Sequence, residues 1–244
     1  MPPTVKVISL ARSLERRATF AASNAHIDFA FFDAVEGASV MGHLHALPEL
    51  FDRDVAYLPG AVGCALSHLT LWKEAADTNK VVTVLEDDAI LRFDFHEQYA
   101  HALKKLPADW DMVVWGWNFD SVVNLNVMPG ISPVVMTFNQ NQLRESIPAF
   151  QELTIAPQLL PLSHCFGTPA YSISPAGGRK FIENCFPLNN FKQVVPGLPY
   201  PLPNNGIDMV MNRIYGATRS FCSMPPLAVT ENDTPNSTIG TGVR

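Results

Sequence analysis

The chain has 244 residues, 47% of them hydrophobic and 16% charged, with a formal net charge of -6. This composition is typical of a globular domain that buries one substantial core, and the negative charge argues against a nucleic-acid-binding protein, since such proteins carry a basic face. The N-terminus lacks the pattern of a signal peptide, and no apolar run approaches the ~18 residues of a membrane-spanning helix. Four scattered cysteines without a CxxC pair favour neither a zinc site nor a disulfide framework. We therefore expect one cytoplasmic α/β domain.

The first predicted unit is a strand, a turn and a helix. Residues 5–10 (VKVISL) follow a strand pattern, and apolar positions recur with the helical period after Ser13. Three basic side chains crowd the start of this helix, namely Arg12, Arg16 and Arg17. Basic groups there oppose the helix dipole, so a bound phosphate would offset their cost, although a solvated basic face explains either of the last two equally well. A second apolar run, residues 27–32, ends at Asp33.

The clearest helical pattern covers residues 59–79. One face carries the apolar side chains Val62, Ala65, Leu66, Leu69, Trp72 and Ala76. The opposite side is uncharged until Lys73, so we expect protein to cover both sides. Ser67 and His68 lie on that second side, where they either line a ligand cleft or belong to the core. Spacing alone favours the core.

An acidic run follows the most regular strand pattern. Residues 81–85 (VVTVL) are typical of a strand buried on both faces, and the next three residues are Glu86, Asp87 and Asp88. Carboxylates clustered in a cleft raise one another's pKa unless a cation neutralises them. Oxygen ligands at the carboxyl end of a buried strand suit Mg²⁺ or Mn²⁺. A solvated acidic turn is the alternative.

A second polar edge follows the strand predicted at residues 109–116 (DWDMVVWG), which is followed by Trp117, Asn118 and Asp120. Aromatic rings beside amides and carboxylates suit a sugar, which has an apolar face and hydroxyls; a core position is the alternative for the tryptophan. Residues 121–163 are rich in Pro, Asn and Gln, which indicates an inserted lid or acceptor surface.

The last third of the chain predicts two helices and two short strands. Ser174 and Pro175 form a helix start, with an N-cap followed by proline at the first helical position. Asp208 lies in the first turn of the next helix, where it either complements the helix dipole or presents a base to a cleft. Strands are predicted at residues 221–224 and 227–229, and residues 231–244 form a polar tail.

Seven segments, in order, resemble glycosyltransferase family 25, which includes bacterial lipooligosaccharide galactosyltransferases and is related to collagen galactosyltransferases. They are VISLARSLERR (7–17), FFDAVEGAS (31–39), GCALSHLTLW (63–72), VLEDDAIL (84–91), WDMVVWG (110–116), GTPAYSISPAGGRKFI (167–182) and GIDMVMN (206–212). The GCxxSH and LEDD motifs at this separation are the most specific part. The chain departs from the family pattern at Ala11 and in the WGWN sequence at residues 115–118.

The resemblance implies an α/β fold of the GT-A type, Rossmann-like, with a mostly parallel central sheet flanked by helices and one catalytic domain over residues 1–230. It implies inverting transfer of a hexose, commonly galactose from UDP-galactose, onto a saccharide hydroxyl of a bacterial surface glycan such as lipooligosaccharide. The expected partners are a UDP-sugar donor and a saccharide or lipid-linked glycan acceptor. We expect at most peripheral membrane association, at the inner face of the bacterial inner membrane.

The resemblance also assigns roles to single residues. The acidic motif would hold a divalent cation, Mn²⁺ or Mg²⁺, with Asp88 as the first ligand and Glu86 or Asp87 assisting. The implied donor-binding residues are Leu10, Arg12, Arg16, Arg17, Asp33, Ser67, His68, Glu86 and Asp87. Trp117 and Asn118 are the predicted acceptor contacts. Asp208 and Asp120 are the candidates for the catalytic base, and Asp208 is preferred.

Two other functions stay open on the same residues. One is a metal-dependent nucleotidyltransferase or phosphohydrolase built on the acidic cluster, which would release pyrophosphate or phosphate without a saccharide acceptor. The other is a saccharide-binding relative without catalysis, which would show no metal-dependent UDP binding.

Overall fold

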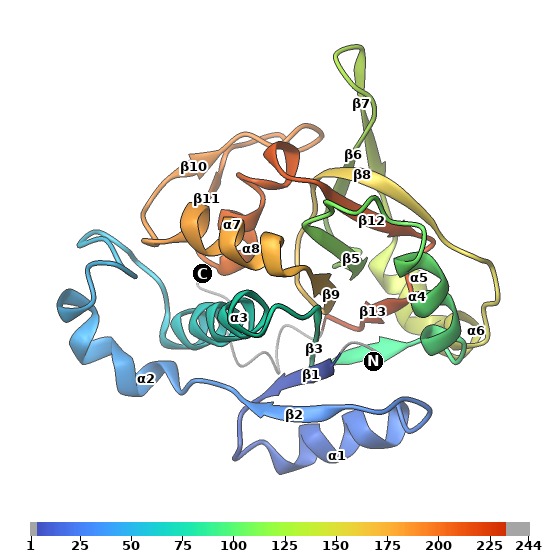
Figure 1. The fold of residues 1–244 in the computed structure, drawn as a ribbon, viewed down its shortest axis with the longest axis horizontal. Coiled ribbons are helices and arrows are strands. Elements are labelled where there is room, and N and C mark those ends of the chain that lie inside the picture. The colour runs from blue at the N-terminus through green and yellow to red at the C-terminus, as the bar shows by residue number, and fades with distance from the viewer. Residues whose placement is uncertain (1–3, 233–244) are drawn as a thin grey trace.

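The computed structural model describes residues 4–232 and is built on a sheet with helices on both faces (Figure 1). Among these residues the sheet has nine strands. In spatial order they are β2 (Ala30–Asp33), β1 (Thr4–Ser9), β3 (Val82–Glu86), β9 (Ala170–Ile173), β5 (Met112–Gly116), β12 (Ser220–Met224), β8 (Gln158–His164), β6 (Val122–Met128) and β7 (Ser132–Thr137).

The strand directions place the polar strand ends at one edge. β1 pairs in parallel with β2 and β3, β5 pairs in parallel with β12, and β9 runs antiparallel between β3 and β5. The remaining pairings, of β8 with β12, β6 with β8 and β7 with β6, are antiparallel. Strands β1, β2, β3, β5, β6 and β12 therefore share one direction. The expected α/β, Rossmann-like GT-A class is confirmed, and the carboxyl ends of β1, β3 and β5 meet at the edge where β9 begins.

Two hydrophobic cores lie on the two faces of the sheet. Helices α3 (Pro59–Thr78), α7 (Pro175–Cys185) and α8 (Ile207–Met211) cover one face, and α1 (Leu14–Ser23) and α4 (Phe95–Leu103) cover the other. Successive strand residues point to opposite faces, so Val84 of β3 packs in the first core and Leu85 in the second. This confirms the strand buried on both faces.

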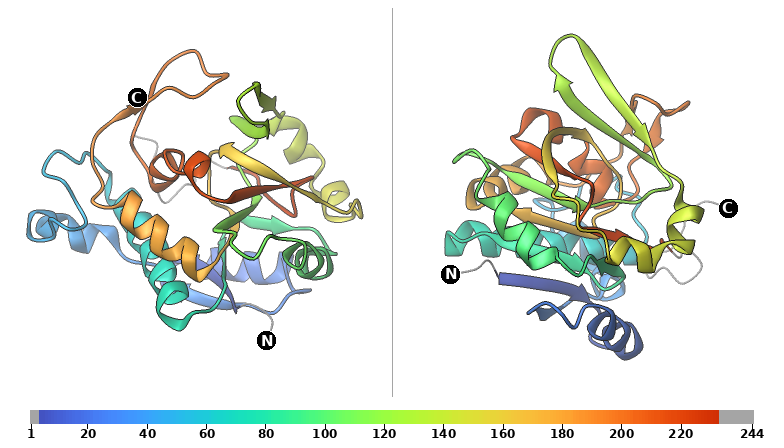
Figure 2. Two further views of the ribbon diagram at one scale, coloured as in Figure 1. Left: turned by 45° about the horizontal axis from the view of Figure 1, so that its top comes forward. Right: turned by 90° about the vertical axis from the view of Figure 1, so that its right-hand side faces the viewer.

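The segment predicted as an insertion, residues 121–163, forms β6, β7, α5 (Gln140–Glu145), α6 (Ile147–Gln151) and β8. The β6–β7 hairpin stands out from the body in Figures 1 and 2. β8 pairs with both β12 and β6, so the segment extends the central sheet instead of forming a separate cap. Its role as a lid or acceptor surface stays a prediction.

The remaining elements are short. They are α2 (Gly37–Val40), the 3-10 helices η1 (Met41–Ala46) and η2 (Tyr215–Ala217), β4 (Ala89–Leu91) paired with β13 (Ala228–Thr230), and β10 (Lys192–Gln193) paired with β11 (Leu202–Pro203). Within residues 4–232, no helix combines the length and the apolar character needed to cross a bilayer. Of the predicted tail, Glu231 and Asn232 are described and residues 233–244 lie outside the described residues.

Candidate functional site

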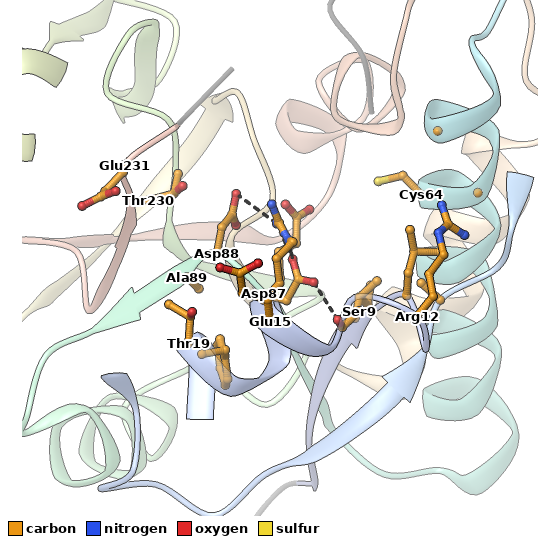
Figure 3. Close-up of a pocket in the computed structure, with 18 of the residues that line it drawn as sticks. Ser9, Arg12, Glu15, Thr19, Cys64, Asp87, Asp88, Ala89, Thr230 and Glu231 are labelled. Carbon is orange, nitrogen blue, oxygen red and sulfur yellow. Dashed lines mark hydrogen bonds and ion pairs between the residues drawn. The ribbon is translucent and has the colours of Figure 1, made fainter. Parts of the chain in front are cut away.

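A pocket of about 910 Å³ opens at the sheet edge where β1 and β3 end (Figure 3). Its volume is within the range typical of small-molecule sites. The walls come from the turn before α1, the start of α3, the turn after β3, helix α6 and the end of β13. The predicted site residues that line it are Leu10, Arg12, Arg16, Glu86, Asp87 and Asp88.

Asp87 is occupied by protein contacts. Ser9 Oγ donates to Asp87 Oδ2 at 2.6 Å, and Arg16 Nε donates to Asp87 Oδ1 at 2.9 Å. Its side chain is 10% exposed. Because both carboxylate oxygens have donors, Asp87 ties the end of β1 and helix α1 to the end of β3.

Of the three acids in the motif, Asp88 has the fewest partners. Its side chain is 40% exposed inside the pocket, and its nearest cation is Arg16 Nη2 at 3.9 Å. The surrounding protein, which desolvates the carboxylate, and the negative charge of Glu86 raise the pKa of Asp88 to about 7, against the opposing effect of Arg16. The pocket therefore holds a carboxylate whose negative charge is poorly compensated (Figure 3).

Glu86 is held by two side chains at one oxygen. Thr168 Oγ1 donates to Glu86 Oε1 at 2.5 Å, and His68 Nε2 lies 3.4 Å from the same atom. Burial raises the pKa of Glu86, but the contacts with His68 and Thr168 and the charge of Arg16 outweigh it and hold that pKa below its ordinary value. Glu86 therefore stays ionised next to Asp88.

Asp88 and Glu86 offer ligands of the type that hard divalent cations prefer. Both supply carboxylate oxygens to the pocket, and the raised pKa of Asp88 reports negative charge that a cation would neutralise. The Mn²⁺ or Mg²⁺ assignment stays a prediction.

A second group of possible ligands is Cys64, His68 and Glu86, whose ligand atoms lie within 4.8 Å of one another. Burial, followed by the charges of Glu86 and Asp208, raises the pKa of the Cys64 thiol. Metals bind the thiolate, and both ring nitrogens of His68 already face protein groups. Both features disfavour this group as a metal site.

The predicted arginines all pair with carboxylates. Arg12, which is 65% exposed, pairs with Glu36, and Arg16 pairs with Asp87. Arg17 Nη2 lies 2.5 Å from Asp33 Oδ1, and neither of these two lines the pocket. Of the three predicted arginines, Arg12 and Arg16 are therefore the ones that a phosphate in the pocket would contact.

Ser67 and His68 are both fully buried. Ser67 Oγ accepts from Val35 N at 2.9 Å and donates to Gly63 O at 2.7 Å, so it holds the loop after β2 against α3. His68 does not line the pocket itself but lies next to two residues that do, Glu86 and Cys64. The structure places the pair behind the pocket wall, and their predicted donor contact would be indirect.

The predicted acceptor residues separate from one another. Trp117 is fully buried and stacks on Phe119 with ring centroids 5.8 Å apart, so the structure places it in the core instead of at a sugar-binding surface. Asn118 packs directly against Gly167. A Cβ added to Gly167 would come within 2.2 Å of Asn118 Oδ1, and the φ angle of Gly167 is +78°, so this contact requires glycine. Asp120 lines a second pocket of about 460 Å³ and accepts from Asn232 Nδ2 at 2.6 Å.

Asp208 lies half-buried at the start of α8. It accepts hydrogen bonds from Gly167 N at 3.1 Å and Met209 N at 2.9 Å, and burial raises its pKa above the ordinary carboxyl value despite these bonds. Thr168, the next residue after Gly167, binds Glu86. Asp208 is therefore connected through one loop to the acidic edge, by which we mean Glu86, Asp87 and Asp88 at the end of β3. It does not line the 910 Å³ pocket.

Sequence reasoning missed two site residues. Thr168 contacts Glu86 from 82 positions away, and its local sequence gives no signal of that contact. Cys64 lines the pocket one helical turn before His68, and this spacing within the GCxxSH motif is the signal that could have identified it.

The comparison with family models agrees with this arrangement. The model described as "Glycosyltransferase family 25 (LPS biosynthesis protein)" matches residues 3–195. The chain belongs to glycosyltransferase family 25. The matched residues include both the GCxxSH and the LEDD motifs, whereas Asp208 follows the end of the match.

Several animal proteins of family 25 are similar to the chain. It is 27% identical over 211 residues to the mouse "Inactive glycosyltransferase 25 family member 3", a match that covers 80% of this chain and 31% of the mouse protein. It is 29% identical over 188 residues to "Procollagen galactosyltransferase 1-B" of Xenopus laevis, covering 71% of this chain and 26% of that protein. The chain thus spans about a third or less of these relatives.

Proposed function

We propose that this family 25 protein is an inverting glycosyltransferase that moves a hexose from a UDP-sugar onto a saccharide hydroxyl. The observation that carries the proposal is the poorly compensated Asp88 beside ionised Glu86 in the 910 Å³ pocket. Galactose is the first donor sugar to test, because the Xenopus relative is named a galactosyltransferase. The family description favours a lipopolysaccharide-type acceptor, including a lipid-linked or lipooligosaccharide glycan.

The acidic motif and two arginines would together bind the diphosphate group of the donor. Asp88 and Glu86 would hold a divalent cation, whose chemistry is to stabilise negative charge on the leaving diphosphate. Arg12 and Arg16, on the same pocket wall, supply fixed positive charge toward the same group.

Asp208 is the preferred base for the transfer. In a single displacement, the acceptor oxygen forms a bond to the anomeric carbon, its proton passes to the carboxylate, and the bond to the diphosphate breaks with its electron pair leaving on UDP. Burial raises the pKa of Asp208, which brings it closer to the operating pH of a general base. Asp120, in the second pocket, is the alternative.

Turnover of labelled donors tests the proposal. The full chain would be incubated with Mn²⁺ and each of radiolabelled UDP-galactose, UDP-glucose and UDP-N-acetylglucosamine, with and without saccharide acceptors. We expect UDP release that Asp88→Ala abolishes and that Arg219→Ala leaves unchanged, since Arg219 pairs with the exposed Asp109. Release of pyrophosphate or of phosphate from a monoester would indicate the nucleotidyltransferase or phosphohydrolase instead.

A saccharide-binding relative without catalysis is the second candidate, because the mouse relative is named inactive. Absence of metal-dependent UDP binding, together with no turnover of any UDP-hexose, would support it against the transferase.

A further inference from the structure

A buried chain of hydrogen bonds runs below the acidic edge and ends at Glu86. Trp72 Nε1 donates to Tyr171 Oη at 2.8 Å, and the same oxygen lies 2.8 Å from His68 Nδ1. The other ring nitrogen of His68, Nε2, lies 3.4 Å from Glu86 Oε1 and 3.4 Å from Thr168 Oγ1, which itself donates to Glu86 Oε1. Trp72, Tyr171 and His68 are at most 1% exposed, so solvent does not compete for these bonds.

The donor and acceptor capacities of the three side chains determine which group donates in each of these hydrogen bonds. The indole of Trp72 is a donor only, so Tyr171 Oη accepts from it and its own proton is free to donate. His68 Nδ1 is the acceptor in reach of that proton. The neutral imidazole then carries its proton on Nε2, which faces Glu86 Oε1 and Thr168 Oγ1. If the imidazole were protonated, His68 Nδ1 and Trp72 Nε1 would both donate to the tyrosine oxygen, and the hydroxyl proton would have no acceptor among these groups.

This series of hydrogen bonds connects the core to the pocket. Trp72 and Tyr171 belong to the hydrophobic core between α3 and the sheet, where an unpaired polar group costs ~1–3 kcal/mol. Apolar side chains would fill the same space without any need for partners. The chain reaches the pocket at Glu86, whose Oε1 also receives the proton of Thr168. Trp72, Tyr171 and His68 thus act in series on a carboxylate that Thr168 also holds.

We propose that Tyr171 is a positioning residue for the nucleotide and metal site, which acts through the Nε2 proton of His68 to hold the Glu86 carboxylate toward the pocket. This inference rests on the proposed function, because it gives Glu86 a ligand to position. Groups that orient a metal-binding carboxylate typically change metal affinity by 10- to 100-fold when they are removed.

The test measures binding of Mn²⁺ by the full chain in the presence of UDP, from the electron paramagnetic resonance signal of free Mn²⁺, together with the thermal midpoint of unfolding. Tyr171→Phe should weaken Mn²⁺ binding by roughly tenfold. Tyr99→Phe is the matched control, because the Tyr99 hydroxyl is equally buried and bonds Thr83 in the core on the other face of the sheet. It should lower the midpoint and leave Mn²⁺ affinity unchanged.

Two variants of His68 distinguish a positioning role from a packing role. His68→Gln puts an amide donor near the position of Nε2 without needing Tyr171, so it should retain most of the Mn²⁺ affinity, whereas His68→Leu should lose it. In the His68→Gln background, Tyr171→Phe should have little further effect, because the coupling runs through the imidazole.

The outcomes distinguish the two proposals. If the wild-type chain binds neither UDP nor Mn²⁺, the proposed function fails and this inference fails with it. If the wild type binds both and Tyr171→Phe matches Tyr99→Phe in Mn²⁺ affinity, the proposed function survives and the positioning role is overturned. Equal loss in His68→Gln and His68→Leu would also overturn it.

Discussion

Adjacent carboxylates in the acidic motif have different roles because their partners differ. Asp87 has a donor for each oxygen, from Ser9 and Arg16, whereas Asp88 has one cation at 3.9 Å. The sequence LEDD shows three equivalent acids. Only the structure shows that Asp87 is a structural link, that Glu86 is held by His68 and Thr168, and that Asp88 faces the pocket.

Substitution of the two aspartates should change stability in opposite directions. Asp87→Asn breaks the Arg16 pair of a side chain that is 10% exposed, and should lower the free energy of unfolding by ~1–3 kcal/mol. Asp88 has a pKa raised to about 7, so the folded state disfavours its ionised form and loses stability as the pH rises toward 7. Asp88→Asn should therefore raise the unfolding midpoint at pH 8 without added metal. Urea denaturation of both variants measures this, and a loss of stability in Asp88→Asn would contradict the assignment.

Asp208 should control transfer and its dependence on pH. We expect Asp208→Asn to bind UDP normally and to lose transfer by at least ~10²-fold. Because the pKa of Asp208 is raised by burial and a base must be ionised, the wild-type rate should fall as the pH drops through that raised pKa. Steady-state rates from pH 5 to 8 measure the effect; normal turnover by Asp208→Asn would remove it from the role and leave Asp120.

At the scale of elements, the pocket depends on a close contact between α2 and α3. A Cβ on Gly63 would come within 2.3 Å of Val35 O, and one on Gly37 within 1.7 Å of Pro59 O. Both glycines line the pocket. The glycine of the GCxxSH motif is thus explained by packing, since it allows the loop after β2 to approach the helix.

Gly63→Ala should destabilise the protein although alanine favours helices. The helix preference would contribute up to about 1 kcal/mol, but the clash with a backbone oxygen is of the overpacking kind that costs about 1–3 kcal/mol. Gly42→Ala is the matched control, because nothing lies within 4 Å of its Cβ position. Denaturant unfolding of both variants measures the difference; equal stability would show that the loop moves freely.

At the scale of the whole molecule, the strands, helices and helix caps that depend on local sequence patterns could be predicted from the sequence. The buried strands β1, β3 and β5, helix α3 and the Ser174 cap of α7, which accepts from Gly177 N at 2.9 Å, all follow from periodicity or capping. Pairing between distant segments does not. β9 lies antiparallel between β3 and β5, and β8 joins β12 to β6, so a segment that reads as an insertion extends the sheet.

The same distinction applies to the site. Strand ends placed Glu86, Asp87 and Asp88 at the pocket from sequence alone. Trp117 follows a strand in the same way, but Phe119 and Phe138 enclose it in the core. Which side of a strand end faces a ligand depends on side chains that arrive from elsewhere in the chain, as Thr168 does at Glu86.

The central claim is that the acidic edge binds a nucleotide with a divalent cation. Calorimetric titration of UDP into the full chain, with Mn²⁺ and then with EDTA, and repeated on Asp88→Ala, tests it most directly. We predict binding that requires both the metal and Asp88. Absence of UDP binding under every condition, or equal binding with EDTA and in Asp88→Ala, would contradict the account.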